Sequence, residues 1–278
     1  MANSVFQTQD ALGKVTTAVF SEQAPAPSAH FFELAAAVPN DFVVIGGGAV
    51  GTDDPGALLT ASFPSGDRQK WLASSKDHGV SSPHRLQTFA IGLKIAGLTP
   101  DQLKTHLKYV SADSGSTAHP TKAVATPPPN PPDSADFIMI SGGFRVNWPP
   151  GDGNLATASF PEIGGTWRAS SKDHQFSNPC TITCFGVALR SDLPGIGRVV
   201  RGEASTLSNQ AAHPSVDTQL PAGFALTGIG AEANSTGAGQ LLWQLAPIAP
   251  RGARASSKDH QISSPGKVKA FALGIKII

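Results

Sequence analysis

The sequence repeats one run of polar side chains that could do chemistry. The run Ala-Ser-Ser-Lys-Asp-His occurs three times, at 73–78, 169–174 and 255–260. In an extended strand, Ser74, Lys76 and His78 of the first copy would point to one side. Ser75 and Asp77 would point to the other. A carboxylate accepts hydrogen bonds from paired hydroxyls, an ammonium donates them and an imidazole does either. The run therefore predicts recognition of a hydroxyl-rich ligand.

Nine side chains follow from this pattern as candidate ligand-binding residues. They are Lys76, Asp77, His78, Lys172, Asp173, His174, Lys258, Asp259 and His260. The aspartates would be the principal hydroxyl acceptors and the lysines donors, while the histidines would shape the pocket. Three copies would strengthen binding to a glycan surface without any new contact. The alternative is structural, because aspartate, serine and histidine also satisfy backbone groups at turns, so the runs would only lock the repeats together.

A second set of histidines recurs at one position per repeat, each preceded by alanine: His30, His119 and His213. Under three-fold symmetry these could converge on the axis and hold zinc, or His30 could pair with His78 as acid and base. A ring that packs on a sheet and bonds a backbone carbonyl is the favoured alternative, because neither a carboxylate-rich loop nor an activated nucleophile recurs beside it. We therefore predict no catalytic residue, no metal and no cofactor, and retain a hydrolase using histidine and aspartate as an alternative.

The remaining motifs point to architecture. The stretch IGGGAVG lacks the GxGxxG and GxxxxGK[ST] spacings of nucleotide sites, so its glycines are expected to allow close strand packing. Trp71 and Trp167 occupy equivalent positions where the third repeat has Ala253, and Trp243 appears on the preceding strand instead. This shift indicates compensation of core volume rather than a sugar-stacking platform. Trp148 is better placed for an exposed contact.

Composition limits the classes of protein and partner. The chain has 278 residues with 29 glycines, 23 prolines, 15% charged residues and a formal charge of +1. Such a balance disfavours helical bundles and gives no global electrostatic attraction to nucleic acid or anionic membranes. No apolar run approaches the roughly 20 residues of a membrane span, and no secretory signal is visible. These features agree with synthesis in the cytoplasm and, if the protein acts outside, release by another route.

The only cysteines, Cys180 and Cys184, are four residues apart. On an extended strand their separation would be about 13 Å, which is too long for a disulfide. A disulfide framework and a four-cysteine zinc site are therefore excluded.

The repeats define three contiguous units, 1–95, 96–190 and 191–278. Within the first, apolar and β-branched stretches bounded by turn residues predict strands at 15–21, 41–49, 58–63, 71–76 and 86–95. The stretch 99–110 has a possible capping residue in Thr99, but its counterparts in the other repeats resemble strands, so we predict a strand there as well. The proline-rich stretch 125–134 is interpreted as an inserted loop.

About five strands in one sheet need a second layer, and three sheets around a common axis would supply it. With its three-fold repetition and glycine-rich strands, the chain resembles the β-prisms of jacalin-type lectins and of the vitelline membrane outer-layer protein. The predicted fold is therefore an all-β, pseudo-three-fold, antiparallel β-prism-like single domain over 1–278. Three tandem small β-sandwiches are the alternative. The resemblance implies a non-catalytic lectin-like module that binds glycans or glycoconjugates on a cell surface, as in the targeting part of a toxin or a host-interaction protein.

Overall fold

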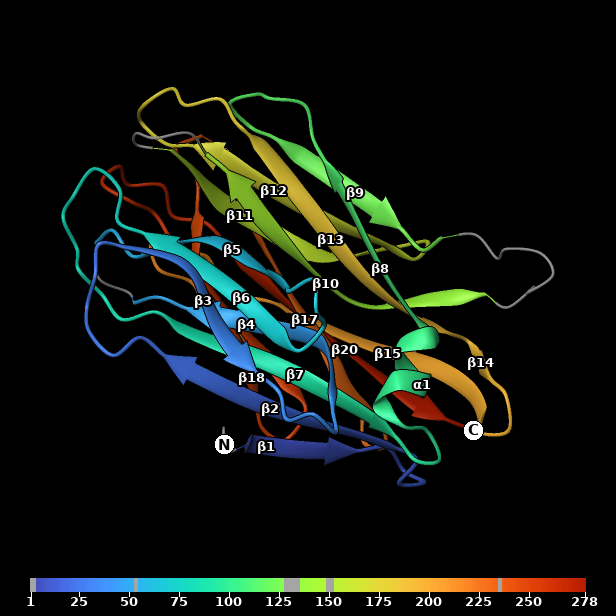
Figure 1. The fold of residues 1–278 in the computed structure, drawn as a ribbon. Helices are drawn as coiled ribbons and strands as arrows, with labels where there is room; N and C mark the ends of the chain where they lie inside the picture. Colours follow the sequence, from blue (N-terminus) through green and yellow to red (C-terminus); the bar gives the residue numbers. More distant parts are fainter. Residues whose placement is uncertain (1–3, 53–54, 128–135, 149–152, 235–236) are drawn as a thin grey trace.

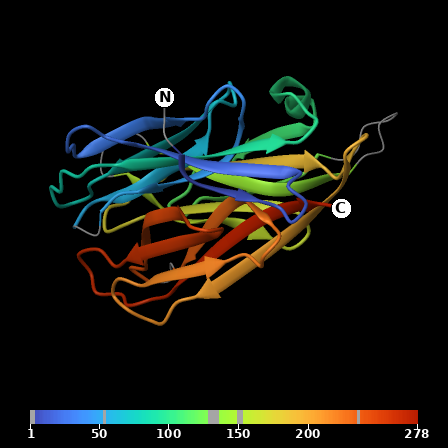
Figure 2. The ribbon, with the colours of Figure 1, turned by 90° about the horizontal axis from the view of Figure 1, so that it is seen from below.

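The computed structural model describes residues 4–52, 55–127, 136–148, 153–234 and 237–278. Strands dominate these residues and form three sheets around a shared interior (Figures 1 and 2). Every pairing between these strands is antiparallel. The prediction of an all-β antiparallel protein is confirmed.

Each sheet combines strands from two of the three sequence repeats. The first sheet joins the first and third repeats, in the order β1 (Ser4–Gln9), β2 (Val15–Gln23), β7 (Gln87–Ile95), β4 (Val43–Val50), β18 (Leu241–Ile248), β19 (Gly252–Lys258) and β16 (Ser215–Gln219). The second joins the first and second repeats, in the order β3 (His30–Ala37), β6 (Lys70–Lys76), β5 (Leu58–Pro64), β10 (Phe137–Asn147), β13 (Thr181–Arg190) and β8 (Leu107–Asp113).

The third sheet joins the second and third repeats. Its order is β14 (Asp192–Leu193), β15 (Gly197–Leu207), β20 (Val268–Ile277), β17 (Ala225–Ala233), β11 (Asn154–Glu162), β12 (Thr166–Asp173) and β9 (Thr121–Ala125). The repeats therefore meet inside the sheets, at the pairs β4–β18, β5–β10 and β11–β17, which we call the seams. Independent sandwiches would keep each repeat's strands in sheets of their own, whereas here every sheet crosses a repeat boundary.

The strands predicted in the first repeat agree closely with β2, β4, β5, β6 and β7. The stretch 99–110 was predicted as a strand, and that prediction is wrong for its first half: α1 spans Pro100–Thr105 and β8 follows from Leu107. The side chain of Thr99 accepts from the amide of Gln102, and the Gln102 side chain accepts from the amide of Thr99. This capping box, with Pro100 in the first turn, stabilises one helical turn that the other repeats do not encode. Residues 128–134 of the predicted proline-rich loop lie outside the described residues.

The tryptophan positions explain the glycine-rich strands. Trp71 and Trp167 are completely buried, and each indole donates to a serine hydroxyl, Ser62 or Ser159. The prediction that they belong to the core is confirmed. A Cβ added to Gly47 would lie 2.4 Å from Cγ of Trp71, so only glycine leaves room for this ring.

The third repeat fills the corresponding space differently. Ile229 stands at the position of Gly47, and Ala253 stands at the position of Trp71. Isoleucine replaces glycine on one strand while alanine replaces tryptophan on the other, so the total side-chain volume in this part of the core is roughly kept. Trp243 packs elsewhere, against three buried leucines that come one from each repeat: Leu58, Leu155 and Leu241.

One hydrophobic cluster draws residues from all three repeats, from Val15 in β2 to Ile277 in β20. Cys180 and Cys184 are buried free thiols. Within the described ranges, no helix has the length and apolar character needed to cross a membrane.

Candidate functional site

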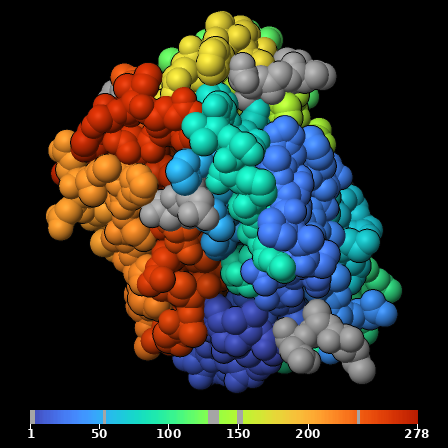
Figure 3. Space-filling view, turned by 90° about the vertical axis from the view of Figure 1, so that its left-hand side faces the viewer, coloured from blue at the N-terminus to red at the C-terminus, as the bar shows by residue number. Residues whose placement is uncertain are grey.

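The three Ala-Ser-Ser-Lys-Asp-His runs close three equivalent strands at one end of the molecule. The strands β6, β12 and β19 end at Lys76, Asp173 and Lys258. The segments that follow them gather at the left-hand end in Figure 1, and Figure 3 views this end directly, with parts of all three repeats on the surface. Sequence repetition therefore becomes spatial proximity.

The lysines of the runs point inward. Their residues are only 1–4% exposed. Lys172 Nζ donates to the carbonyls of Gly237 and Ala238, at 2.6 and 2.8 Å, and Lys258 Nζ donates to the carbonyl of Thr52 at 3.1 Å. Lys76 Nζ lies 4.2 Å from the centroid of the Trp148 ring. Each lysine thus contacts a loop that belongs to another repeat.

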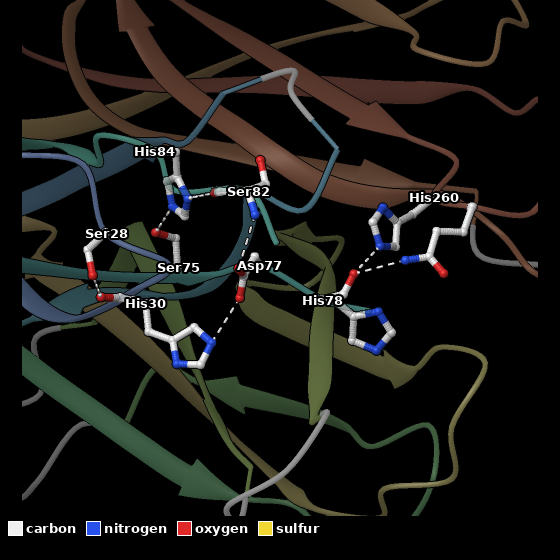
Figure 4. Close-up of polar contacts among 9 residues, drawn as sticks. Ser28, His30, Ser75, Asp77, His78, Ser82, His84 and His260 are labelled. Atoms are coloured by element: carbon white, nitrogen blue, oxygen red, sulfur yellow. Dashed lines mark hydrogen bonds and ion pairs between the residues drawn. The ribbon is translucent and has the colours of Figure 1, made fainter. Parts of the chain in front are cut away.

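The histidines of the runs form a triangle at the junction of the three repeats. The ring centroids of His78, His174 and His260 are 5.5–5.6 Å apart. His174 Nε2 donates to the carbonyl of His260, and His260 Nε2 donates to the carbonyl of His78, both at 2.5 Å. Figure 4 shows the second of these bonds. Convergence was considered only as a possibility for the other histidine set, His30, His119 and His213, whereas the histidines that meet belong to the runs.

A tight turn follows each of these histidines. The backbone carbonyls of His78 and His260, which lie in such turns, accept from the ring of a neighbouring histidine. The amides of Val80, Phe176 and Ile262 each donate to the histidine carbonyl two residues earlier, at 2.7 Å. The central residues Gly79, Gln175 and Gln261 have φ between 61° and 64°. Such γ-turns with positive φ are rare and strained, and glutamine at two of them shows that the surrounding contacts impose the conformation.

The aspartates of the runs pair with the second histidine set. Nε2 of His30, His119 and His213 lies 3.0, 3.3 and 3.7 Å from Oδ1 of Asp77, Asp173 and Asp259. The other carboxylate oxygen of each aspartate accepts from an amide five residues later, that of Ser82, Asn178 or Ser264. The first pair is drawn in Figure 4.

Two expectations about the second set are therefore corrected. Its rings do not converge on an axis, and their Nε2 atoms face carboxylates rather than backbone carbonyls. Among the described residues, no group of three His, Cys, Asp or Glu side chains is arranged to hold a metal ion. These aspartate side chains are 12–15% exposed and the histidines 43–65%, so the exposed partner of each pair is the histidine.

A ligand-binding role for the nine predicted residues stays a prediction. The contacts of the lysines and central histidines favour the structural alternative, since these side chains are buried against neighbouring repeats. The aspartates are themselves largely buried, and each orients a histidine that is exposed on the surface. One of those histidines, His30, lines the pocket described next.

This pocket, of about 600 Å³, lies at the seam between the first and second repeats. We call it the seam pocket. Its floor consists of small side chains from β5 and β6, Thr60, Ala61 and Ser74. Its walls carry His30, Phe32, Glu33, Arg145, Val146 and Trp148. The volume suits a small ligand.

A bulge in β3 builds one wall. The pairing of β3 with β6 jumps from Phe31 to Leu34, so Phe32 and Glu33 stand outside the ladder. Glu33 has φ of 54°, and its amide donates to Ser74 Oγ at 3.0 Å. Phe32 is 70% exposed and stacks on Trp148, with centroids 5.9 Å apart. Bulges and strained residues of this kind are typical of places where a side chain is redirected for function.

The other repeats lack these features. The strands β9 and β16 pair with their neighbours without a bulge. Hydroxyl pairs occupy the equivalent places there, Thr121 with Ser170 and Ser215 with Ser256. The sequence analysis singled out Trp148 but missed Phe32, Glu33 and Arg145. Aligning the three repeats residue by residue would have exposed the one-residue insertion that places Phe32 and Glu33 where the other repeats have a single residue.

Burial controls the protonation of several groups nearby. It lowers the pKa of His84, whose Nδ1 donates to the Ser82 carbonyl while Nε2 accepts from the Ser75 hydroxyl (Figure 4). Burial also lowers the pKa of His260 and of Lys172. The neutral form of both histidines is therefore favoured in the folded protein.

Comparisons with models of protein families and with curated proteins yield no match.

Proposed function

We propose that the protein is a non-catalytic, lectin-like module that binds carbohydrate in the seam pocket. The observation that carries this proposal is that one pocket contains an exposed aromatic ring together with a hydrogen-bond donor and a hydrogen-bond acceptor. Phe32 offers an apolar face, while Glu33 accepts and Arg145 donates hydrogen bonds. Apolar walls with a few placed polar groups are typical of small-molecule sites.

The Ala-Ser-Ser-Lys-Asp-His runs support this site indirectly. Asp77 holds His30 at the wall of the pocket, and Lys76 contacts one face of Trp148. The lysines and central histidines hold the three repeats together behind the pocket. In this account the runs maintain the frame, and the features found only at this seam recognise the ligand.

The frame itself is proposed to be a pseudo-three-fold β-prism-like unit formed by the whole chain. Three features support it: each sheet crosses one repeat boundary, one leucine from each repeat meets at a single cluster, and three equivalent histidines form a triangle. By the resemblance to prism lectins, the ligands would be glycoconjugates on a cell surface, and the module would serve a toxin or a host-interaction protein as its targeting part.

A glycan array tests the proposed function, using the wild-type chain with and without a chelator beside two matched variants. Phe32→Ala removes the exposed ring of the pocket. Phe176→Ala removes a half-exposed phenylalanine that does not line it. We expect wild-type binding that survives the chelator, a loss of about fivefold or more with Phe32→Ala, and no change with Phe176→Ala, since stacking on an aromatic ring is worth about 1 kcal/mol or more. Absence of binding across the array, or equal binding by Phe32→Ala, would refute the proposal.

A second candidate is a structural or assembly protein without a saccharide ligand, favoured by the buried contacts of the lysines and histidines. The glycan array separates the two candidates, because an assembly protein of this kind would bind no saccharide. Joint replacement of Asp77, Asp173 and Asp259 by asparagine tests a narrower point, namely whether the carboxylates bind ligand themselves or only brace the turns. A ligand role for the carboxylates predicts lost array binding with nearly unchanged melting. A purely structural role predicts a large fall in melting temperature, because asparagine offers one acceptor oxygen where aspartate offers two, so either the turn amide or the histidine loses its partner at each site.

A further inference from the structure

A second pocket, of about 550 Å³, lies over β11, β15, β17 and β20, at the seam between the second and third repeats. Its floor holds Phe160 and Phe271, whose rings stack with centroids 5.3 Å apart and planes inclined by 17°. Ile163, at the tip of the hairpin between β11 and β12, lies beside it and is fully exposed.

The same aromatic pair occurs beside the seam pocket. On the second sheet, Phe63 and Phe185 stack with centroids 5.0 Å apart and planes inclined by 21°. A cation approaches each pair: Arg145 Cζ lies 5.5 Å from the Phe63 ring, and Lys269 Nζ lies 4.8 Å from the Phe271 ring. Two of the three seams therefore share one construction.

The third seam lacks the pair. Ala246 stands where Phe63 and Phe160 stand in the other repeats, so Phe89 has no stacking partner at this position. The pair therefore occurs at the two seams that carry these pockets: it forms the floor of the second pocket and lies next to Arg145 of the seam pocket.

The rim of the second pocket contains donors and acceptors that balance each other. Arg201 forms an ion pair with Glu203, and Lys269 is the cross-strand neighbour of Glu232. Glu162 on the hairpin is paired with Arg168 at 2.5 Å. A rim of compensated charges around an apolar floor suits a neutral, hydroxyl-rich ligand better than a strongly charged one.

We propose that this pocket is a second saccharide-binding site, which makes a single chain bivalent. The inference extends the proposed function and rests on it for the class of ligand. Two sites on neighbouring sheets would let one chain bridge two branches of a polysaccharide, and would raise avidity for a glycan-coated surface.

The test uses mannan, galactomannan and arabinogalactan, each coupled to beads and also free in solution. Retention on beads requires one site, whereas turbidity of the free polysaccharide requires two. Arg201→Ala removes a donor of the second pocket, and Glu232→Ala is a second variant, at an exposed residue of the same rim. Arg198→Ala is the matched control, because this arginine is exposed on the same strand and lies outside the pocket.

We expect the wild type and Arg198→Ala to be retained and to cause turbidity. Arg201→Ala and Glu232→Ala should be retained yet cause at least tenfold less turbidity. Undiminished turbidity with both rim variants would overturn the second site while leaving the seam pocket intact. Retention lost with Arg201→Ala but kept by Phe32→Ala would support the second site and overturn the seam pocket. Wild-type protein that binds none of the three polysaccharides would overturn both.

Discussion

Replacement of Lys172 by methionine tests whether the repeated lysines hold the repeats together. Methionine has a similar length and no charge, so the change removes the ammonium without leaving a large cavity. Lys172 Nζ donates to two carbonyls of the third repeat, at 2.6 and 2.8 Å. Both acceptors lose this partner in the variant, whereas the rest of β12 keeps its pairing.

The size of the effect follows from two opposing contributions. A hydrogen bond to a charged group contributes about 1.5–3 kcal/mol net, so two would contribute about 3–6 kcal/mol. The variant no longer has to bury an ammonium, which offsets part of the loss. Burial already lowers the pKa of Lys172, in agreement with an unfavourable desolvation contribution. We expect a net loss of about 2–4 kcal/mol, or about 4–8 °C in Tm for a chain of this size.

Thermal unfolding followed by circular dichroism measures the shift. Lys267→Met is the control, because Lys267 is exposed and its replacement should change stability by less than about 0.5 kcal/mol. Equal Tm values for the two variants would refute the structural role of Lys172. Loss of saccharide binding at unchanged Tm would instead assign this lysine to ligand recognition.

Three further predictions concern packing, pH and thiol reactivity. Gly47→Ala would place a Cβ 2.2 Å from the Phe89 carbonyl oxygen and 2.4 Å from Trp71 Cγ, so the denaturant midpoint should fall by an amount equivalent to about 1–3 kcal/mol or more, and an unchanged midpoint would contradict this packing. Because burial lowers the pKa of His84 and His260, their contribution to stability is complete above the unfolded pKa of about 6.5 and is lost as the pH falls below it. Tm should therefore decline between pH 7 and pH 5, and a constant Tm over this range would contradict the neutral buried rings. Burial raises the pKa of Cys184 to about 12, so a thiol reagent at pH 8 should modify it only after denaturation; rapid labelling of the native protein would show that the site is open.

The strands were predictable because each is short, apolar and bounded by turn residues, and because the pattern is present three times. The burial of Trp71 and Trp167 also followed from comparing the repeats. The single helical turn was missed because the counterparts of 99–110 in the other repeats are strands. Its capping box is a local signal that repetition concealed.

The partners of the repeated polar residues could not be predicted from spacing. A strand pattern shows which side chains share a face, but not which repeat supplies the neighbouring strand or loop. The lysines were therefore interpreted as donors to a ligand, although their long side chains reach loops of another repeat. The aspartate and histidine pairs, such as Asp77 with His30, join residues 47 positions apart through the pairing of β3 with β6. The seam pocket depends on the bulge in β3, which the other two repeats lack. Comparing only the features that recur in all three repeats could therefore not predict it.

A crystal structure grown with the saccharide that binds best on the array would show directly whether the seam pocket is the binding site. We expect a sugar ring against Phe32, with hydroxyls within hydrogen-bond distance of Glu33 or Arg145. A saccharide bound only at the turns after Asp77, Asp173 and Asp259, with the seam pocket empty, would contradict it.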